Sequence, residues 1–220
     1  MVTETDKSGS APDAPLDDQI GRAIEALRHG GVVAIPTDTV YGLAASLARP
    51  DALSRIYAIK GRSGDKALPI LISDMSQLAR LAKRASPAAL ALAHAFWPGA
   101  LTIVVPASDT VPDEVTRGVP TVGLRMPAND VALEVIRAAG GALAVTSANR
   151  SGEPEARTAA AVIERLGGRI AFVVDGGRSG EAPASTVVDA SEASIRILRV
   201  GAISPEQIHS ALAEAGFDHA

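Results

Sequence analysis

Three cations lie within seven residues at Lys60, Arg62 and Lys66, in the segment Lys-Gly-Arg-Ser-Gly-Asp-Lys. Lysine supplies a point charge and arginine a planar fork of donors for phosphate oxygens. Gly61 and Gly64 permit backbone bends that larger residues resist. We predict that this turn can hold a polyphosphate, although a basic loop taken alone is more often only a solvated turn.

Further polar residues lie where apolar runs end, which is where a sheet holds side chains rigidly and a loop exposes them. Thr37 lies in such a loop, residues 36–43, with hydroxyl groups and one carboxylate. The alternative for this loop is a turn in which Asp38 and Thr39 satisfy backbone groups. Arg125 ends a strand-like run, either as a clamp for a carboxylate or phosphate or as a solvent-facing terminus.

A second group of hydrogen-bonding side chains follows the apolar run 142–145. Thr146, Ser147 and Asn149 come directly after it, and helix capping alone would not need so many polar residues. Ser185 opens another apolar run and Arg199 ends the next. Each of these residues is ordinary on its own, so only their combination indicates a site.

Other classes of active site have less support. The four histidines show neither metal-ligand spacing nor a triad pattern, and the chain contains no cysteine for a thiolate, a disulfide or a cysteine-based zinc site. Residues 175–180, Asp-Gly-Gly-Arg-Ser-Gly, lack the ending of a P-loop and the glycine spacing of a dinucleotide-binding fold. We expect this segment to form a flexible turn over a site.

Strand-like runs alternate with helical patterns through most of the 220 residues, which predicts an α/β fold with a mixed sheet and helices packed on it. Residues 1–15 lack apolar periodicity and are expected to form a flexible tail, and residues 16–220 a single domain. The first helix is expected to have Asp17 or Asp18 as its N-cap and to end at Gly30. The other expected helices are 50–59, 75–82, 87–96, 129–139, 158–166 and one from 204, and the expected strands are 32–35, 70–72, 101–105, 121–125, 142–145, 170–174, 185–189 and 195–200.

Composition limits the partners and the compartment. A formal net charge of −4 and a pI near 5.6 argue against a general nucleic-acid coat, so any anion site must be local. Aromatic residues make up only 3% of the chain, which leaves few platforms for base stacking. No apolar run reaches the roughly 20 residues of a membrane helix, and the N-terminus lacks a signal pattern. We therefore expect a cytoplasmic protein without membrane contact.

Taken together and in this order, these segments resemble the YrdC family, whose members make threonylcarbamoyl-AMP for the tRNA modification t6A. The resemblance runs from about Asp18 to Ala202 and is carried by seven motifs. They are residues 36–43, Lys60-Gly-Arg62 with Lys66, 97–102, 123–127, 146–149 with Ser151-Gly152, 185–189 and 199–201.

The resemblance implies a twisted α/β fold with a large concave, positively lined cavity, and it implies roles for individual residues. Nucleotide and phosphates would be held by Lys60, Arg62, Thr121, Ser147, Asn149 and Arg199, with Lys60 and Arg62 as the catalytic cations. L-Threonine would be held by Thr37, Lys66, Arg125 and Ser185, with Arg125 pairing with its carboxylate. The implied substrates are L-threonine, bicarbonate and ATP, with Mg²⁺ held mainly by the phosphates, no metal site built by the protein, and downstream tRNA-modifying proteins as partners.

Two departures from the family pattern keep alternatives open. Ser63 and Ala67 stand where many relatives have proline, so a YciO-like paralogue with another substrate is one alternative. A double-stranded RNA-binding module that uses the cavity is another. The chain ends at Ala220, which is typical of the short family members without an additional C-terminal domain.

Overall fold

The computed structural model describes residues 14–61, 66–180 and 183–217. Within these ranges the strands form one twisted sheet in the order β7-β1-β2-β6-β3-β5-β4-β8-β9. The pairs β1–β7, β3–β5 and β4–β8 are parallel and the other neighbours are antiparallel. The expected α/β fold with a mixed sheet is confirmed. The strands are β1 (Val33–Ile35), β2 (Gly42–Ser46), β3 (Ile70–Ile72), β4 (Leu101–Pro106), β5 (Thr121–Arg125), β6 (Ala142–Ser147), β7 (Phe172–Val173), β8 (Thr186–Asp189) and β9 (Arg196–Arg199).

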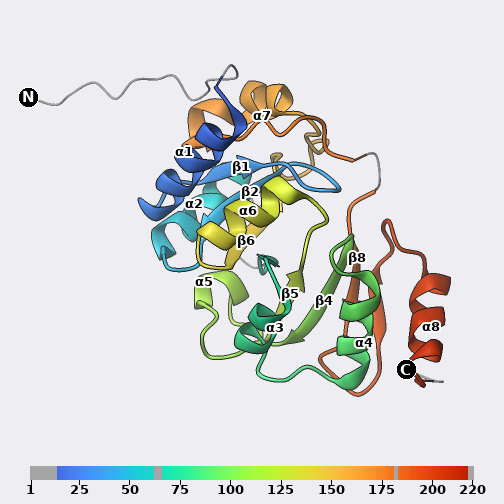
Figure 1. Cartoon of the computed structure of the whole chain (residues 1–220). Helices are drawn as coiled ribbons and strands as arrows, with labels where there is room; N and C mark the ends of the chain where they lie inside the picture. The colour runs from blue at the N-terminus through green and yellow to red at the C-terminus, as the bar shows by residue number, and fades with distance from the viewer. Residues whose placement is uncertain (1–13, 62–65, 181–182, 218–220) are drawn as a thin grey trace, which may run out of the picture.

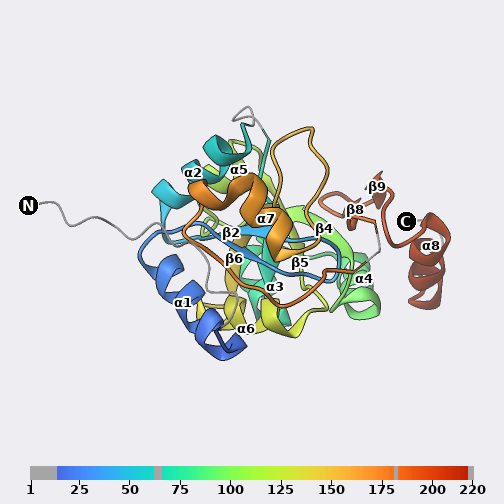
Figure 2. The ribbon, with the colours of Figure 1, turned by 90° about the horizontal axis from the view of Figure 1, so that it is seen from above.

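Helices cover both faces of this sheet (Figure 1). They are α1 (Leu16–Arg28), α2 (Pro50–Lys60), α3 (Met75–Leu81), α4 (Pro87–Phe96), α5 (Asp113–Thr116), α6 (Asp130–Ala138), α7 (Ala159–Leu166) and α8 (Pro205–Glu214), with a 3₁₀ turn at Gly167–Arg169. Figure 2 shows α1 and α6 on one side of β2 and β6, with α2 and α7 on the other. Because successive side chains of a strand point to opposite faces, Val33 and Ile35 of β1 pack with α1 and α6, whereas Ala34 belongs to the cluster that includes α2 and α7.

Side-chain caps fix the beginnings of several helices. Thr158 caps α7 as expected, and Ser204 forms a reciprocal capping box with Gln207 at the start of α8. The expected cap of α1 is wrong, because the helix begins at Leu16, directly after Pro15. Asp17 and Asp18 instead lie in the first turn, where their charges favour the positive end of the helix dipole.

Two elements were not expected from the sequence. Strand β2 has the sequence Gly-Leu-Ala-Ala-Ser, without a β-branched or aromatic residue, and it forms because β1 and β6 pair with its two edges. The short helix α5 lies between the expected strands 101–105 and 121–125, where no helix was expected. Residues 1–13 of the expected tail lie outside the described ranges. In the described part of the chain, no helix has the length and apolar character needed to cross a membrane.

Candidate functional site

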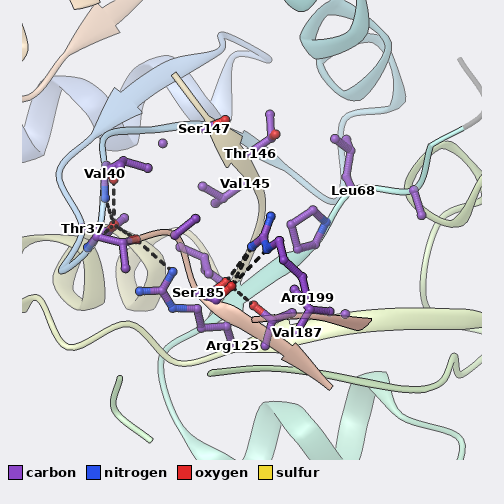
Figure 3. Close-up of a pocket in the computed structure, with 18 of the residues that line it drawn as sticks. Thr37, Val40, Leu68, Arg125, Val145, Thr146, Ser147, Ser185, Val187 and Arg199 are labelled. Carbon is purple, nitrogen blue, oxygen red and sulfur yellow. Dashed lines mark hydrogen bonds between the residues drawn. The ribbon is translucent and has the colours of Figure 1, made fainter. Parts of the chain in front are cut away.

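The cavity drawn in Figure 3 has a volume of about 490 Å³. Leu71 and Val145 line it and belong to the same hydrophobic cluster as residues of α1 and α6, so the cavity lies on the face of the sheet that these helices cover elsewhere. Sheet register creates its floor, because Leu71 of β3 pairs with Arg125 of β5, and Thr102 of β4 pairs with Val187 of β8. All four of these residues line the cavity. The concave cavity expected from the sequence is therefore present. Six residues predicted for the site line it together, namely Thr37, Thr121, Arg125, Ser147, Ser185 and Arg199.

Arg125 is the most buried cation of the cavity, with only 6% of its surface exposed. Its Nη2 donates to Oδ1 of Asp38 at 2.6 Å, Nη1 donates to Oγ1 of Thr39 at 3.1 Å, and Nε donates to the Gly99 carbonyl at 2.9 Å. Burial lowers the pKa of Arg125 from its ordinary value, the Asp38 carboxylate opposes this shift, and Arg199 adds to it. Because a guanidinium stays protonated even so, the protein holds a fixed positive charge in the cavity.

The loop that carries Thr37 is a hydrogen-bonded turn. The Thr37 hydroxyl donates to the Val40 carbonyl at 2.7 Å and accepts from the backbone N–H groups of Thr39 and Val40. The alternative interpretation of this loop was a turn in which Asp38 and Thr39 satisfy the backbone groups. Thr37 makes these contacts instead, whereas Asp38 and Thr39 accept hydrogen bonds from Arg125. With its proton already used, Thr37 offers the cavity no further hydroxyl donor.

Ser185 and Arg199 form the opposite wall. Arg199 donates to the Ser185 carbonyl from Nη2 at 2.8 Å and from Nε at 3.2 Å, and to Ser185 Oγ from Nη2 at 3.2 Å (Figure 3). Ser185 Oγ also lies 2.9 Å from Thr102 Oγ1. In this wall Arg199, which is predicted to bind the nucleotide, is hydrogen-bonded to Ser185, which is predicted to bind the amino acid.

Lys60 lies behind the cavity and is not one of its lining residues. Only 4% of it is exposed, and its ammonium donates to the Ser147 carbonyl at 2.6 Å, the Asn149 carbonyl at 2.9 Å and Asn149 Oδ1 at 3.0 Å. Gly61, at a φ of 57°, ends α2 directly after it. In this arrangement Lys60 fixes the segment that carries Ser147, which does line the cavity.

The remaining predicted residues lie elsewhere. Asn149 is buried, donates to the Glu153 carbonyl at 2.6 Å and does not line the cavity. Lys66 is exposed and also lies outside the lining. Arg62 and Ser63 lie outside the described residues. The predicted roles of these residues stay predictions.

Residues 175–180 pack beside the Thr37 loop and are anchored at several points. The Tyr41 hydroxyl donates to the Gly177 carbonyl at 2.7 Å, and burial raises the pKa of Tyr41 from its ordinary value. The backbone N–H of Thr37 donates to Ser179 Oγ at 3.4 Å. At Gly180 an added Cβ would lie 2.2 Å from the Asp38 carbonyl oxygen, so only glycine allows this approach.

Sequence reasoning missed several residues that line the cavity, including Thr39, Tyr41, Thr102 and Glu155. Thr102 carried a usable signal, because it alternates with the fully apolar Leu101 and Ile103 and must therefore face the other side of the sheet. Across the described residues, no group of three or more potential metal ligands comes together. Among the described lining residues, Glu155 is the one that carries a carboxylate.

Comparison with known families gives a match over most of the chain. The Sua5/YciO/YrdC family, described as "Telomere recombination", matches residues 25–201. The threonylcarbamoyl-AMP synthase of Bacillus subtilis is 44% identical over 89% of this chain and 57% of its own length. The putative threonylcarbamoyl-AMP synthase of Mycobacterium tuberculosis is 36% identical over 86% of this chain and 87% of its own length. The chain thus spans little more than half of the first relative and most of the second.

Two solved structures match the fold closely. Sua5 of Pyrococcus abyssi complexed with L-threonine superposes with a TM-score of 0.84 at 41% identity, covering 89% of this chain and 57% of that one. YciO of Escherichia coli superposes with a TM-score of 0.80 at 25% identity, covering 90% of this chain and 96% of that one. Both likenesses extend over about nine tenths of the chain.

Proposed function

The chain belongs to the Sua5/YciO/YrdC family, and from this premise we propose that it is an L-threonylcarbamoyladenylate synthase. In this reaction the amine of L-threonine combines with bicarbonate to give a carbamate and water. A carbamate oxygen then attacks the α-phosphorus of ATP, the bond from this phosphorus to the bridging oxygen of the β-phosphate breaks, and pyrophosphate leaves. The protein thus acts as a nucleotidyltransferase that makes threonylcarbamoyl-AMP.

The observation that carries this proposal is the buried Arg125 at the cavity floor. A guanidinium has five N–H donors, and the protein uses one each on Nε, Nη1 and Nη2. Two donors therefore remain for a ligand, which suits the carboxylate of an amino acid. The solved relative that binds L-threonine is 41% identical to this chain, which adds support.

The other residues divide between the two substrates. Arg199, Thr121 and Ser147 line the cavity where they would hold the nucleotide, and Lys60 and Asn149 support Ser147 from behind. Thr37 and Ser185 lie with Arg125 around the amino acid, and Arg62 and Lys66 keep the roles that the family pattern implies. Every reactant is anionic or becomes so, since L-threonine is converted to a carbamate. Positioning and charge neutralisation therefore supply most of the catalysis, and no protein nucleophile is needed.

The residues of this site suit Mg²⁺ only when the bound nucleotide supplies most of its ligands. Glu155 is the lining carboxylate in the described part of the cavity, and a single carboxylate is typical of a magnesium ion held mostly by phosphates and water. When bound, the ion would neutralise phosphate charge. The product is a reactive mixed anhydride, so we expect cytoplasmic tRNA-modifying proteins to consume it directly.

The test is pyrophosphate release by the purified protein with ATP and Mg²⁺, measured with and without L-threonine and with and without bicarbonate. We expect release only when both are present. Pyrophosphate release at the same rate with and without L-threonine would contradict the proposal.

A YciO-like paralogue with another substrate is a second candidate, favoured by the coverage of 96% of the YciO chain. The lower identity to YciO, 25% against 36–44% for the synthases and the solved Sua5 structure, weighs against this candidate. Nucleotide binding without threonine-dependent pyrophosphate release would favour this candidate.

A further inference from the structure

Two hydroxyl groups lie together in the cavity wall at Thr102 and Ser185. Their oxygens are 2.9 Å apart, each residue is 6% exposed, and both line the cavity. Thr102 belongs to β4 and Ser185 directly precedes β8, so two neighbouring strands fix the pair rigidly. Nη2 of Arg199 donates to the hydroxyl oxygen Oγ of Ser185 at 3.2 Å.

The pair must present one hydrogen-bond donor to the cavity. Two hydroxyl groups carry two protons, and one of these forms the bond between the two oxygens. Arg199 can only donate, so it accepts neither proton. Within the described ranges, Thr102 and Ser185 have no other side-chain hydrogen-bond acceptor, so the second proton is available to a bound molecule.

The direction of the chain of hydrogen bonds selects Thr102 as this donor. Because Ser185 Oγ accepts from a cation, its own proton becomes a better donor and goes to Thr102. Thr102 then directs its proton to the ligand. The pair at Thr37 and Thr39 is different, because the Thr37 hydroxyl donates to the Val40 carbonyl and accepts from two backbone N–H groups. The Thr37 proton is therefore not available to a ligand, whereas the Thr102 proton is.

We infer that Thr102 binds an anionic carboxylate-type oxygen, from either L-threonine or bicarbonate, as a specificity-determining residue of the site. This inference rests on the proposed function. A buried hydroxyl donor gains most from a charged acceptor, and Arg125 and Arg199 supply the positive charge around it. Ser185 then acts through Thr102 and carries the influence of Arg199 to it.

The test uses Thr102→Val, which keeps the shape of the side chain and removes the hydroxyl. We expect the KM for L-threonine or the KM for bicarbonate to rise about 10-fold to 100-fold, the loss of one charge-assisted hydrogen bond. A rise for threonine identifies the amino-acid carboxylate, and a rise for bicarbonate identifies that ion. Thr102→Ser should restore the affinity. Thr116→Val makes the same change at a buried threonine outside this cavity and should leave both values within about twofold.

Unchanged KM values in Thr102→Val, or a rise confined to ATP, would overturn the inference. Should the valine variant fail to fold, Thr102→Ala makes the same comparison without adding bulk. A wrong proposed function can be distinguished from a wrong inference about Thr102, because in that case the wild-type protein itself shows no turnover. In that case equilibrium dialysis with labelled L-threonine and with labelled bicarbonate replaces kinetics, and equal binding by wild type and Thr102→Val would overturn the subsite.

Discussion

Replacing Lys60 by methionine tests whether its ammonium holds the Ser147 segment in place. The change keeps an unbranched chain but removes three short donations, at 2.6, 2.9 and 3.0 Å, to oxygens of Ser147 and Asn149. Each hydrogen bond to a charged group contributes about 1.5–3 kcal/mol, and relief of the buried charge offsets part of the loss. We expect the free energy of unfolding to fall by about 3 kcal/mol. For a chain of this size that lowers the Tm by about 6–12 °C.

The assay is thermal unfolding followed by circular dichroism, with Lys66→Met as the matched control. Lys66 is exposed, so the same substitution there should shift the Tm by less than about 2 °C. Adding ATP should stabilise the wild-type protein and stabilise Lys60→Met much less, because Ser147 loses its support. Equal Tm values for the two variants would refute the positioning role. Normal stability with lost turnover would instead favour direct phosphate contact by Lys60.

The remaining predictions concern the amino-acid subsite, the packing of its loop and the pH dependence of stability. Arg125→Gln should raise the KM for L-threonine at least tenfold and change the KM for ATP much less, and equal effects in steady-state kinetics would contradict its carboxylate role. Gly180→Ala should lower the Tm by several degrees because its Cβ would lie 2.2 Å from the Asp38 carbonyl oxygen, whereas Gly168→Ala, with open space around it, should not. Burial raises the pKa of Asp189, but hydrogen bonds from a neighbouring serine and arginine outweigh it, so its folded pKa lies below 3.8. Its carboxylate should therefore stabilise the fold fully above pH 3.8 and lose this effect as the pH falls through the folded pKa. Asp189→Asn should destabilise the protein at pH 7 in urea unfolding, and should destabilise it progressively less as the pH is lowered below 3.8.

Periodic patterns predicted most of the fold, because the apolar spacing of strands and amphipathic helices is visible within short stretches of the sequence. Strand β2 was missed because its small residues have little preference for a strand, and its neighbours in the sheet decide its conformation. Strand order depends on contacts between distant segments and could not be read from the sequence. The N-cap of α1 was placed two or three residues late, since aspartate suits both the cap and the first turn.

The candidate site was predicted in part. Polar residues at strand ends, such as Arg125 and Ser185, gather at one cavity because the strands place them there. The position of Lys60 could not be predicted, since its partners lie 87 and 89 residues away. Thr102 was missed, although its alternation with Leu101 and Ile103 placed it on the other face of the strand, because the sequence does not show which face lines a cavity.

The most direct measurement of the proposed synthase activity follows carbon from bicarbonate. The purified protein is incubated with ATP, Mg²⁺, L-threonine and ¹³C-bicarbonate, and the nucleotides are analysed by mass spectrometry. We expect a threonylcarbamoyl-AMP that carries the label, formed in step with pyrophosphate and absent when threonine is omitted. Hydrolysis of ATP without a labelled adenylate would contradict the proposed function.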